Sequence, residues 1–220
     1  MENLKSNLSE TFFNELKKGY HQYRIQKRIS EIAIPDYIEW NQIFEYLMDN
    51  VNTADDYVFL GWFSIFISDK IERSADESFS FQQYEKAFQI DPTNMFSQFL
   101  IAYCTYFGKG TTKDLAHADE LYERFSNSGN HLCQYTFATR LMHKNKHDYK
   151  LRVSFMFKSA AMKEHIAAML FLGDRYTNGI GIERDLHKAL FWYAKYLKND
   201  QYIEPNRFLK WVSSQIKKQV

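Results

Sequence analysis

Three groups of residues in the sequence have side chains that could bind a ligand or react. Residues 107–113, FGKGTTK, combine glycines, hydroxyls and lysines as a phosphate-binding loop does, but they lack the G-x4-G-K-S/T spacing and follow no predicted strand. His143 and His147 are spaced to share one face of a helix and could bind a metal ion, but two intervening lysines crowd them with positive charge. We therefore expect a turn at the first stretch and no metal site at the second.

The third group is the pair of cysteines, Cys104 and Cys133. They show neither CxxC spacing nor neighbouring histidines, so we interpret both as small core residues and expect no zinc site and no disulfide. No serine, cysteine or threonine stands in a recognisable nucleophile elbow, and no paired carboxylates stand in an apolar setting. We expect no catalytic residue, no metal, no cofactor and no enzymatic activity. An enzyme with an unrecognised active site stays an alternative, because catalytic groups can assemble from distant positions.

Composition limits the class of protein further. The chain has 220 residues, of which 45% are hydrophobic, enough for one elongated domain or two small ones. Its net charge of +1 gives no general attraction to nucleic acid or to an acidic membrane, so neither is an expected partner. The first residues lack the pattern of a secretory signal, and no apolar run is long enough to span a membrane. These features predict a cytoplasmic protein, and we favour a monomer.

The charge is unevenly distributed along the chain. Residues 30–69 contain eight acidic residues and no lysine or arginine. Residues 140–158 reverse this balance, with six basic residues against Asp148 alone. This asymmetry predicts either a molecule that steers an oppositely charged partner or simply solvated helix faces.

The elements that would position these residues are helices that repeat. Only three prolines occur, and the glycines fall mostly at apparent turns, which is typical of long helices joined by short loops. A shift of 71 residues superimposes six positions of the chain on identical residues. These are Gly108 on Gly179, Gly110 on Gly181, Asp114 on Asp185, Leu115 on Leu186, Ala118 on Ala189 and Tyr122 on Tyr193. A further copy between them gives a period near 36 residues.

One of these copies carries a family pattern. Residues 168–193 resemble the SEL-like repeat, A-x3-L-G-x2-Y-x2-G-x-G-V-x2-D-x2-K-A-x2-W-Y, at nearly every signature position. Residues 98–129 resemble it more loosely, with Ala102 in place of the helix glycine and Leu121 in place of the tryptophan. The copy between them has lost the glycine turn. A unit further upstream ends in Asp91-Pro-Thr-Asn94 and is similar to a tetratricopeptide hairpin.

The pattern also has a physical meaning. Gly173 in the middle of a helix costs about 1 kcal/mol relative to alanine, so we expect a second helix to cross closely there. Gly179 and Gly181 supply the positive φ angles that end the helix and reverse the chain, and Asp185 can cap the helix that follows. Ala189 is the small residue expected on the partner helix at the crossing.

The resemblance implies an all-α fold, a right-handed α-solenoid of stacked antiparallel helix pairs. We expect repeats at about 53–94, 95–130, 131–165 and 166–200, with N-terminal helices in residues 1–52 packed on the array. An amphipathic helix in residues 201–220 is expected to cap the far end.

In arrays of this class the first helix of each pair lines the concave face. The resemblance therefore implies a partner-binding surface on those helices, rich in the aromatic residues that most often anchor interfaces. Its expected members are Val58, Trp62, Ile65, Phe99, Tyr103, Tyr106, Tyr135, Thr139, Met142, Leu170 and Asp174. Because 17% of the chain is aromatic, many of these rings could instead fill the core.

What the resemblance implies about function is a module that binds another protein. Short bacterial proteins of this type include immunity proteins, so one expectation is a bacterial immunity protein that occludes a cognate toxin. The acidic N-terminal part would suit a secreted toxin with a basic surface. The alternative is a regulatory or secretion-system adaptor. Whether the concave face, the convex face or the N-terminal helices make the contact stays open.

Overall fold

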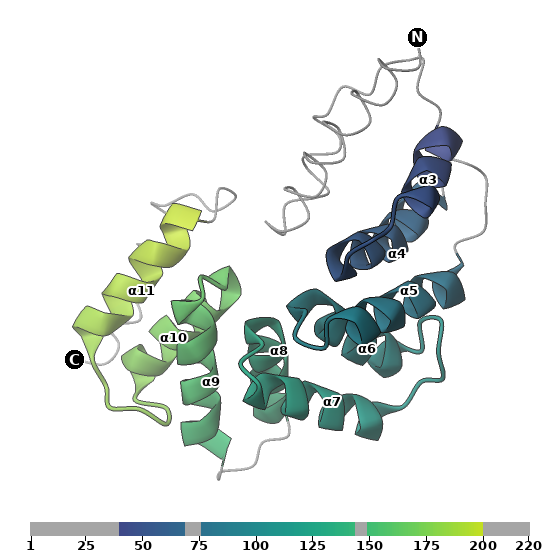
Figure 1. The fold of residues 1–220 in the computed structure, drawn as a ribbon. Helices are drawn as coiled ribbons and strands as arrows, with labels where there is room; N and C mark the ends of the chain where they lie inside the picture. The colour runs from purple at the N-terminus through teal and green to yellow at the C-terminus, as the bar shows by residue number, and fades with distance from the viewer. Residues whose placement is uncertain (1–39, 69–75, 144–148, 200–220) are drawn as a thin grey trace. The chain divides into compact units, whose positions relative to one another are not determined.

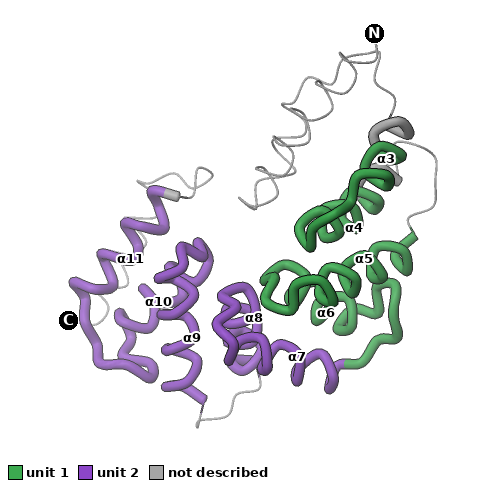
Figure 2. Tube along the Cα trace, in the orientation of Figure 1, with its two compact units in different colours: residues 1–114 green, residues 115–220 purple. Residues whose placement is uncertain are grey.

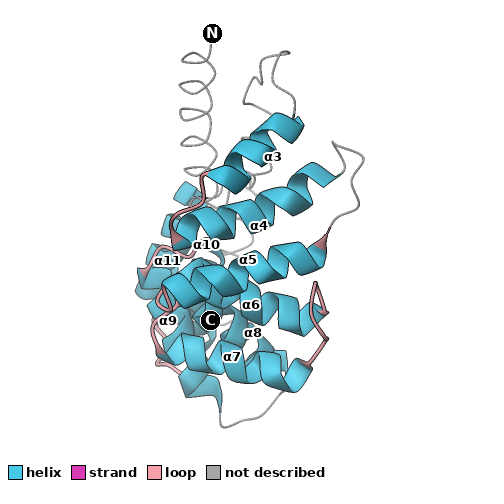
Figure 3. Cartoon of the chain, turned by 45° about the vertical axis from the view of Figure 1, so that its right-hand side comes forward, coloured by secondary structure: helices cyan, strands magenta, loops and turns pink. Residues whose placement is uncertain are grey.

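The computed structural model describes residues 40–68, 76–143 and 149–199, and helices are the only regular elements within these ranges (Figures 1 and 3). The helices in chain order are α3 (Trp40–Asp49), α4 (Ala54–Ser68), α5 (Glu77–Ile90), α6 (Met95–Phe107), α7 (Leu115–Asn127), α8 (His131–His143), α9 (Lys150–Met162), α10 (Ile166–Asn178) and α11 (Leu186–Asn199). The all-α prediction is confirmed. Of the N-terminal helices expected in residues 1–52, α3 lies in the described part of the chain. Residues 1–39, the expected capping helix and His147 lie outside it.

The chain divides into two compact units, residues 1–114 and residues 115–220 (Figure 2). In the first unit α4 packs on α3, α5 and α6, and α5 packs on α6. In the second unit each helix from α7 to α11 packs on the next one along the chain. Each unit is thus a stack of neighbouring helices, the arrangement predicted for helix pairs.

Two of the helix pairs cross at a glycine. A Cβ atom added to Gly173 in α10 would lie 2.5 Å from Cε1 of Tyr193 in α11, closer than any real contact. The same holds in the α4–α5 pair, where a Cβ on Gly61 would lie 2.7 Å from Cε1 of Tyr84. Both tyrosines are buried, so the space left by the missing side chain holds an aromatic ring. The predicted close crossing at Gly173 is confirmed, and the aromatic ring against it is the new detail.

The two copies of the glycine turn have the same backbone geometry. Gly108 and Gly179 end α6 and α10 with φ angles of 74° and 65°. In the first turn the amide of Asp114 donates to the Thr105 carbonyl at 2.9 Å, and 71 residues later Asp185 donates to Tyr176 at 3.0 Å. The left-handed conformation predicted for these glycines is therefore confirmed.

The second glycine of each turn has a separate role. A Cβ on Gly110 would lie 1.9 Å from the carbonyl oxygen of Glu77 at the start of α5. A Cβ on Gly181 would lie 2.2 Å from the carbonyl oxygen of Lys150 at the start of α9. Each turn thus rests its backbone directly on the helix start of the preceding hairpin, which only glycine allows.

Side-chain caps begin several of the helices. Asp185 accepts a hydrogen bond from the amide of Lys188 at 2.9 Å, which confirms the predicted cap of α11. The first helices α6, α8 and α10 follow Asn94, Asn130 and His165, whose side chains accept hydrogen bonds from the first-turn amides. These three caps recur with the repeat, and histidine replaces asparagine at the third.

A buried arginine joins α9, α10 and the turn after α10. Arg175 is 6% exposed, and its guanidinium donates to the hydroxyl of Ser154 and to the carbonyl of Ile180, both at 3.0 Å. It also donates to the carbonyl of Lys150 and lies over the ring of Phe157. Burial lowers the pKa of this guanidinium. The charge is stabilised by carbonyl and hydroxyl oxygens and by a ring face.

Candidate partner-binding surface

Helix α6 carries a strip of aromatic side chains on its exposed face. Phe99, Tyr103 and Phe107 follow one another at four-residue spacing, with ring centroids 6.1 and 4.6 Å apart. Tyr106 packs its ring edge-to-face on Phe107 at 4.7 Å. Phe107 is 51% exposed, and the other three rings are half-buried. We call these four residues the α6 aromatic strip.

One end of the strip is held by charged side chains. The ammonium of Lys109 lies 5.8 Å from the ring centre of Tyr103 and 3.8 Å from a carboxylate oxygen of Glu77. Asn94 and Gly108 cap α6 at its two ends, so the rings stand on a helix whose ends are satisfied. The strip is therefore a preorganised apolar surface with a cation at its edge.

The expected residues on α4 divide between core and surface. Val58 has no exposed surface and packs in the core with Ala54 and Ala87, so it has no surface to offer a partner. Trp62 is half-buried against Phe59 at 5.9 Å between ring centres. Ile65 is also half-buried. The structure therefore leaves two of the three α4 residues partly accessible.

In the second unit, the predicted residue Tyr135 belongs to a cluster of rings. It stacks on His165 at 4.3 Å between ring centres and lies 5.9 Å from Phe171. The ring of His131 meets His165 edge-on at 6.2 Å. This cluster joins α8 to the start of α10.

Both histidines in this cluster favour the neutral form. Burial, and then the neighbouring His131, lower the pKa of His165 to about 4. Burial also lowers the pKa of His131, with a smaller effect from Lys163. Nδ1 of His165 accepts the amide hydrogen of Ala168, a contact that exists only while that nitrogen is unprotonated.

The remaining expected residues have mostly structural contacts. Asp174 accepts a 2.6 Å hydrogen bond from the hydroxyl of Tyr193, and burial raises the pKa of this carboxyl. The hydroxyl of Thr139 donates to its own helix, and Leu170 is half-buried. Met142 is 39% exposed. Asp174 thus positions the ring that crosses at the helix glycine.

Sequence reasoning missed four aromatic residues of these surfaces. Phe107 stands four residues after Tyr103, a helical spacing that would have placed it on the same face. His165 occupies the cap position that asparagine holds one and two repeats earlier, so the repeat itself carried its signal. His131 and Phe171 carried no such signal, because their contacts depend on how α8 and α10 pack.

Part of the basic segment is paired inside the second unit. A guanidinium nitrogen of Arg140 lies 2.5 Å from a carboxylate oxygen of Asp119, and one of Arg152 lies 2.5 Å from a carboxylate oxygen of Glu123. Both ion pairs join the helix of the arginine to α7. Within the described residues, no group of three or more potential metal ligands lies together. Over the same ranges, no helix is both long and apolar enough to cross a membrane.

The repeated turn, the glycine crossings and the stacked helices define a helical-repeat protein of the hairpin type. The Sel1 repeat family model matches residues 96–130 and 166–195, which are the two copies that carry the glycine turn. The chain therefore carries Sel1 repeats, and the resemblance seen in its sequence is confirmed. Sel1 repeats are in general protein–protein interaction modules on a helical scaffold.

Solved structures support the same fold. The chain is similar to a Sel1 repeat protein from Oxalobacter formigenes, with 19% identity and a TM-score of 0.60, over 84% of this chain and 70% of that one. It is also similar to a protective antigen of uropathogenic Escherichia coli strains that displays an SLR fold, with 19% identity and a TM-score of 0.54. That match covers 73% of this chain but only 33% of the antigen. No curated protein matches the sequence.

Proposed function

We propose that this chain binds a partner protein through the exposed faces of the first helices of its hairpins, with the α6 aromatic strip as the main anchor. The observation that carries this proposal is the ladder of contacting rings on α6, ending in the half-exposed Phe107. Trp62 on α4 and the Tyr135 cluster on α8 provide further aromatic surface on helices of the same kind.

Aromatic rings on a capped helix are well suited to this role. Tyrosine and phenylalanine bury a large area while few rotatable bonds become fixed, which makes them frequent interface anchors. The rings of Tyr103 and Phe107 already contact each other, so little further ordering is needed on binding. Lys109 at the edge of the strip contacts both the ring of Tyr103 and the carboxylate of Glu77, which helps to hold that ring in place.

Among cellular roles, we propose that the protein is a bacterial immunity protein, a monomer that occludes a toxin in the cytoplasm. The acidic bias of residues 30–69 supports a partner with a basic surface. Within that segment, Glu45 and Asp49 of α3 are exposed. The test is expression of each polypeptide encoded beside this chain. Cell death that co-expression of this chain prevents would support immunity, and harmless neighbours would favour an adaptor.

The binding surface can be mapped by a photo-crosslinking residue in the full-length chain. Placed at Tyr103, it is expected to capture a partner polypeptide in its native cells, which mass spectrometry then identifies. Gln82, on the exposed side of α5, is the matched control position and should capture none. Crosslinks from position 82 and none from position 103 would exclude the α6 aromatic strip as the site.

The captured partner then allows an affinity measurement. Tyr103→Ala and Tyr106→Ala are each expected to weaken binding by about 1–3 kcal/mol, because each removes an anchoring ring. Gln82→Ala should leave the affinity unchanged, and circular dichroism should show equal helicity in all three variants. Equal affinity of the tyrosine variants and the parent chain would contradict the proposal.

A further inference from the structure

The outer face of α9 is apolar in a way that the fold does not require. Leu151, Phe155 and Met162 are 56%, 58% and 66% exposed, and Lys158 between them is also exposed. Their spacing of four, three and four residues places all four within an arc of about 60° on one side of the helix. We call them the α9 outer stripe.

The corresponding helices of other hairpins show what this face normally contains. The buried rings Tyr84, Tyr122 and Phe157 occupy the same repeat position in α5, α7 and α9 and align the three helices. In α5 the residues matching the stripe are Ser78, Gln82, Glu85 and Gln89, and in α7 they are Ala116, Glu120, Glu123 and Asn127. Neither set contains a large apolar residue. In α11, aligned through the buried Tyr193, the matching residues are His187, Phe191, Ala194 and Lys198, of which Phe191 is 53% exposed. Three large exposed apolar residues on this face therefore occur in α9 alone among the four helices.

The electric charge of the face is also reversed. Lys158 stands where α5 has Glu85 and α7 has Glu123. Lys150 and Lys163, at the two ends of α9, are exposed as well. The apolar stripe therefore contains one positive charge, and two more lie at the ends of the helix.

We propose that the α9 outer stripe binds an acidic amphipathic helix of a partner protein. Spacing of four, three and four residues is the seam along which two helices pack, and such a seam takes apolar side chains at the same spacing from the partner. A carboxylate opposite Lys158 would neutralise the only charge within the seam. This surface is separate from the α6 aromatic strip and lies in the other unit, so the proposed function does not depend on it.

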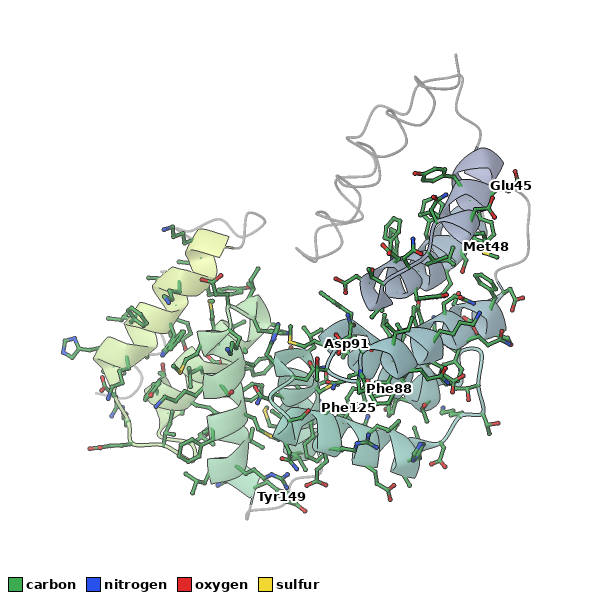
Figure 4. All side chains as sticks on the ribbon, in the orientation of Figure 1. Glu45, Met48, Phe88, Asp91, Phe125 and Tyr149 are labelled. Carbon is green, nitrogen blue, oxygen red and sulfur yellow. The ribbon has the colours of Figure 1, made fainter. Side chains whose placement is uncertain are left out.

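Other occupants fit the stripe less well. A helix that lies on a membrane presents a broad apolar face, whereas this stripe is narrow and interrupted by a lysine. A second copy of the chain could offer acidic α3, where Glu45 and Met48 project from the helix (Figure 4). Among the described side chains of α3, however, Met48 is the only exposed large apolar one. Residues 1–28 have an amphipathic pattern but carry several lysines and arginines, which would repel this face.

The test uses the full-length chain and a synthetic peptide of about three heptads, with leucine along its seam and glutamate on both flanks. Fluorescence anisotropy of the labelled peptide should show saturable binding that weakens as salt rises. A peptide with lysine in place of each glutamate should not bind. Phe155→Ser and Lys158→Glu should each weaken binding of the acidic peptide by about tenfold or more.

Two further measurements separate the alternatives. Gln82→Ser on α5 is the matched control and should bind the peptide as the parent chain does, and Lys158→Glu should now bind the lysine peptide. Absence of acidic-peptide binding, or equal binding by Phe155→Ser and the parent, would overturn the proposal. If the parent chain sediments as a dimer and Phe155→Ser as a monomer, the face serves self-association and the proposal is wrong. If the parent chain binds phosphatidylserine vesicles and Phe155→Ser does not, the face binds a membrane and the proposal is equally wrong.

Discussion

Residues 94–114 and residues 165–185 form the same capped helix and glycine turn, 71 positions apart, but they fill it with different side chains. The glycine φ angles and the hydrogen bond that closes each turn agree closely. The residue four positions before the first glycine is a buried cysteine in one copy, Cys104, and a buried arginine in the other, Arg175. The cap is Asn94 in one copy and His165 in the other.

The comparison separates two contributions to the fold. Glycine fixes the path of the backbone, and it does so identically whatever the neighbouring side chains are. The polar network around the turn is particular to each copy: Arg175 binds two carbonyls and a hydroxyl, whereas burial raises the pKa of Cys104 to about 12 and keeps it a neutral thiol. The backbone repeat and the side-chain network can therefore be tested one at a time.

The largest effect is expected from the shared glycine. Gly181→Ala should destabilise the protein by about 3–5 kcal/mol, because the new Cβ would overlap the carbonyl of Lys150 in addition to the strain of a positive φ. Gly129→Ala is the control, since Gly129 also has a positive φ but nothing lies within 4 Å of its added Cβ. It should cost about 1–2 kcal/mol. Chemical denaturation measures both, and equal losses would show that the contact with α9 is unimportant.

A smaller effect is expected from the arginine that only one copy has. Arg175→Met keeps the length of the side chain but removes every hydrogen bond to Lys150, Ser154 and Ile180, so stability should fall by about 2–3 kcal/mol. Cys104→Ala, at the matching position, should cost about 1 kcal/mol. The free energy of unfolding of both variants tests this, and a harmless Arg175→Met would mean that the network adds nothing to the turn.

The histidine cap should make the stability depend on pH. In the unfolded chain His165 binds a proton near pH 6.5, whereas in the folded chain its pKa is about 4. The stabilisation that neutral His165 gives the folded chain is therefore complete above pH 6.5 and is lost as the pH decreases toward 4. At pH 5 the free energy of unfolding should be lower by about 1–2 kcal/mol. His165→Asn, which copies the cap at Asn94, should be less sensitive over this range. Thermal unfolding of both proteins at pH 7 and pH 5 measures the difference, and parallel pH curves would contradict it.

The smallest effect concerns the end of α9. Glu164 has a φ of 64°, and the amide of the following residue donates to the carbonyl of Ala160, so Glu164 holds the left-handed position that Gly129 holds after α7. Glu164→Gly should therefore stabilise the protein by about 1 kcal/mol. An increase in the denaturation midpoint checks this, and a decrease would show that the carboxylate contributes more than the backbone strain costs.

The backbone features were predictable because they depend on residue types that have few alternatives. The G-x-G spacing predicted two left-handed turns, Gly173 predicted the helix crossing, and Asp185 predicted a cap, and all are present. The contact of Gly181 with the preceding hairpin was not predictable, because a single hairpin gives no information on what its turn will touch. Arg175 was missed because an arginine in a helix is normally assigned to the solvent side.

The candidate site was less predictable than the fold. Equivalence between repeats predicted that Val58 lies on the same exposed face as Phe99 and Tyr135. Val58 instead has no exposed surface, because it belongs to a core cluster against which Tyr57, Phe96 and Leu100 pack. A repeat alignment gives the direction of a side chain from its helix, whereas exposure also depends on neighbours that are not equivalent. The partner-binding surface on the first helices therefore stays a prediction, and the α6 aromatic strip is its best-supported part.

The backbone contact at Gly110 and Gly181 has a consequence for how such a gene can change. The second glycine of each turn contacts the backbone at a helix start of the preceding hairpin. Duplication of one hairpin therefore gives a stable fold only if the new copy provides the same backbone contact for the next turn. Recombination breakpoints between helices of one hairpin would preserve this junction, and those between hairpins would have to restore it. Sequence exchange in this protein should therefore preserve the contact between neighbouring hairpins more strictly than the ends of any single hairpin.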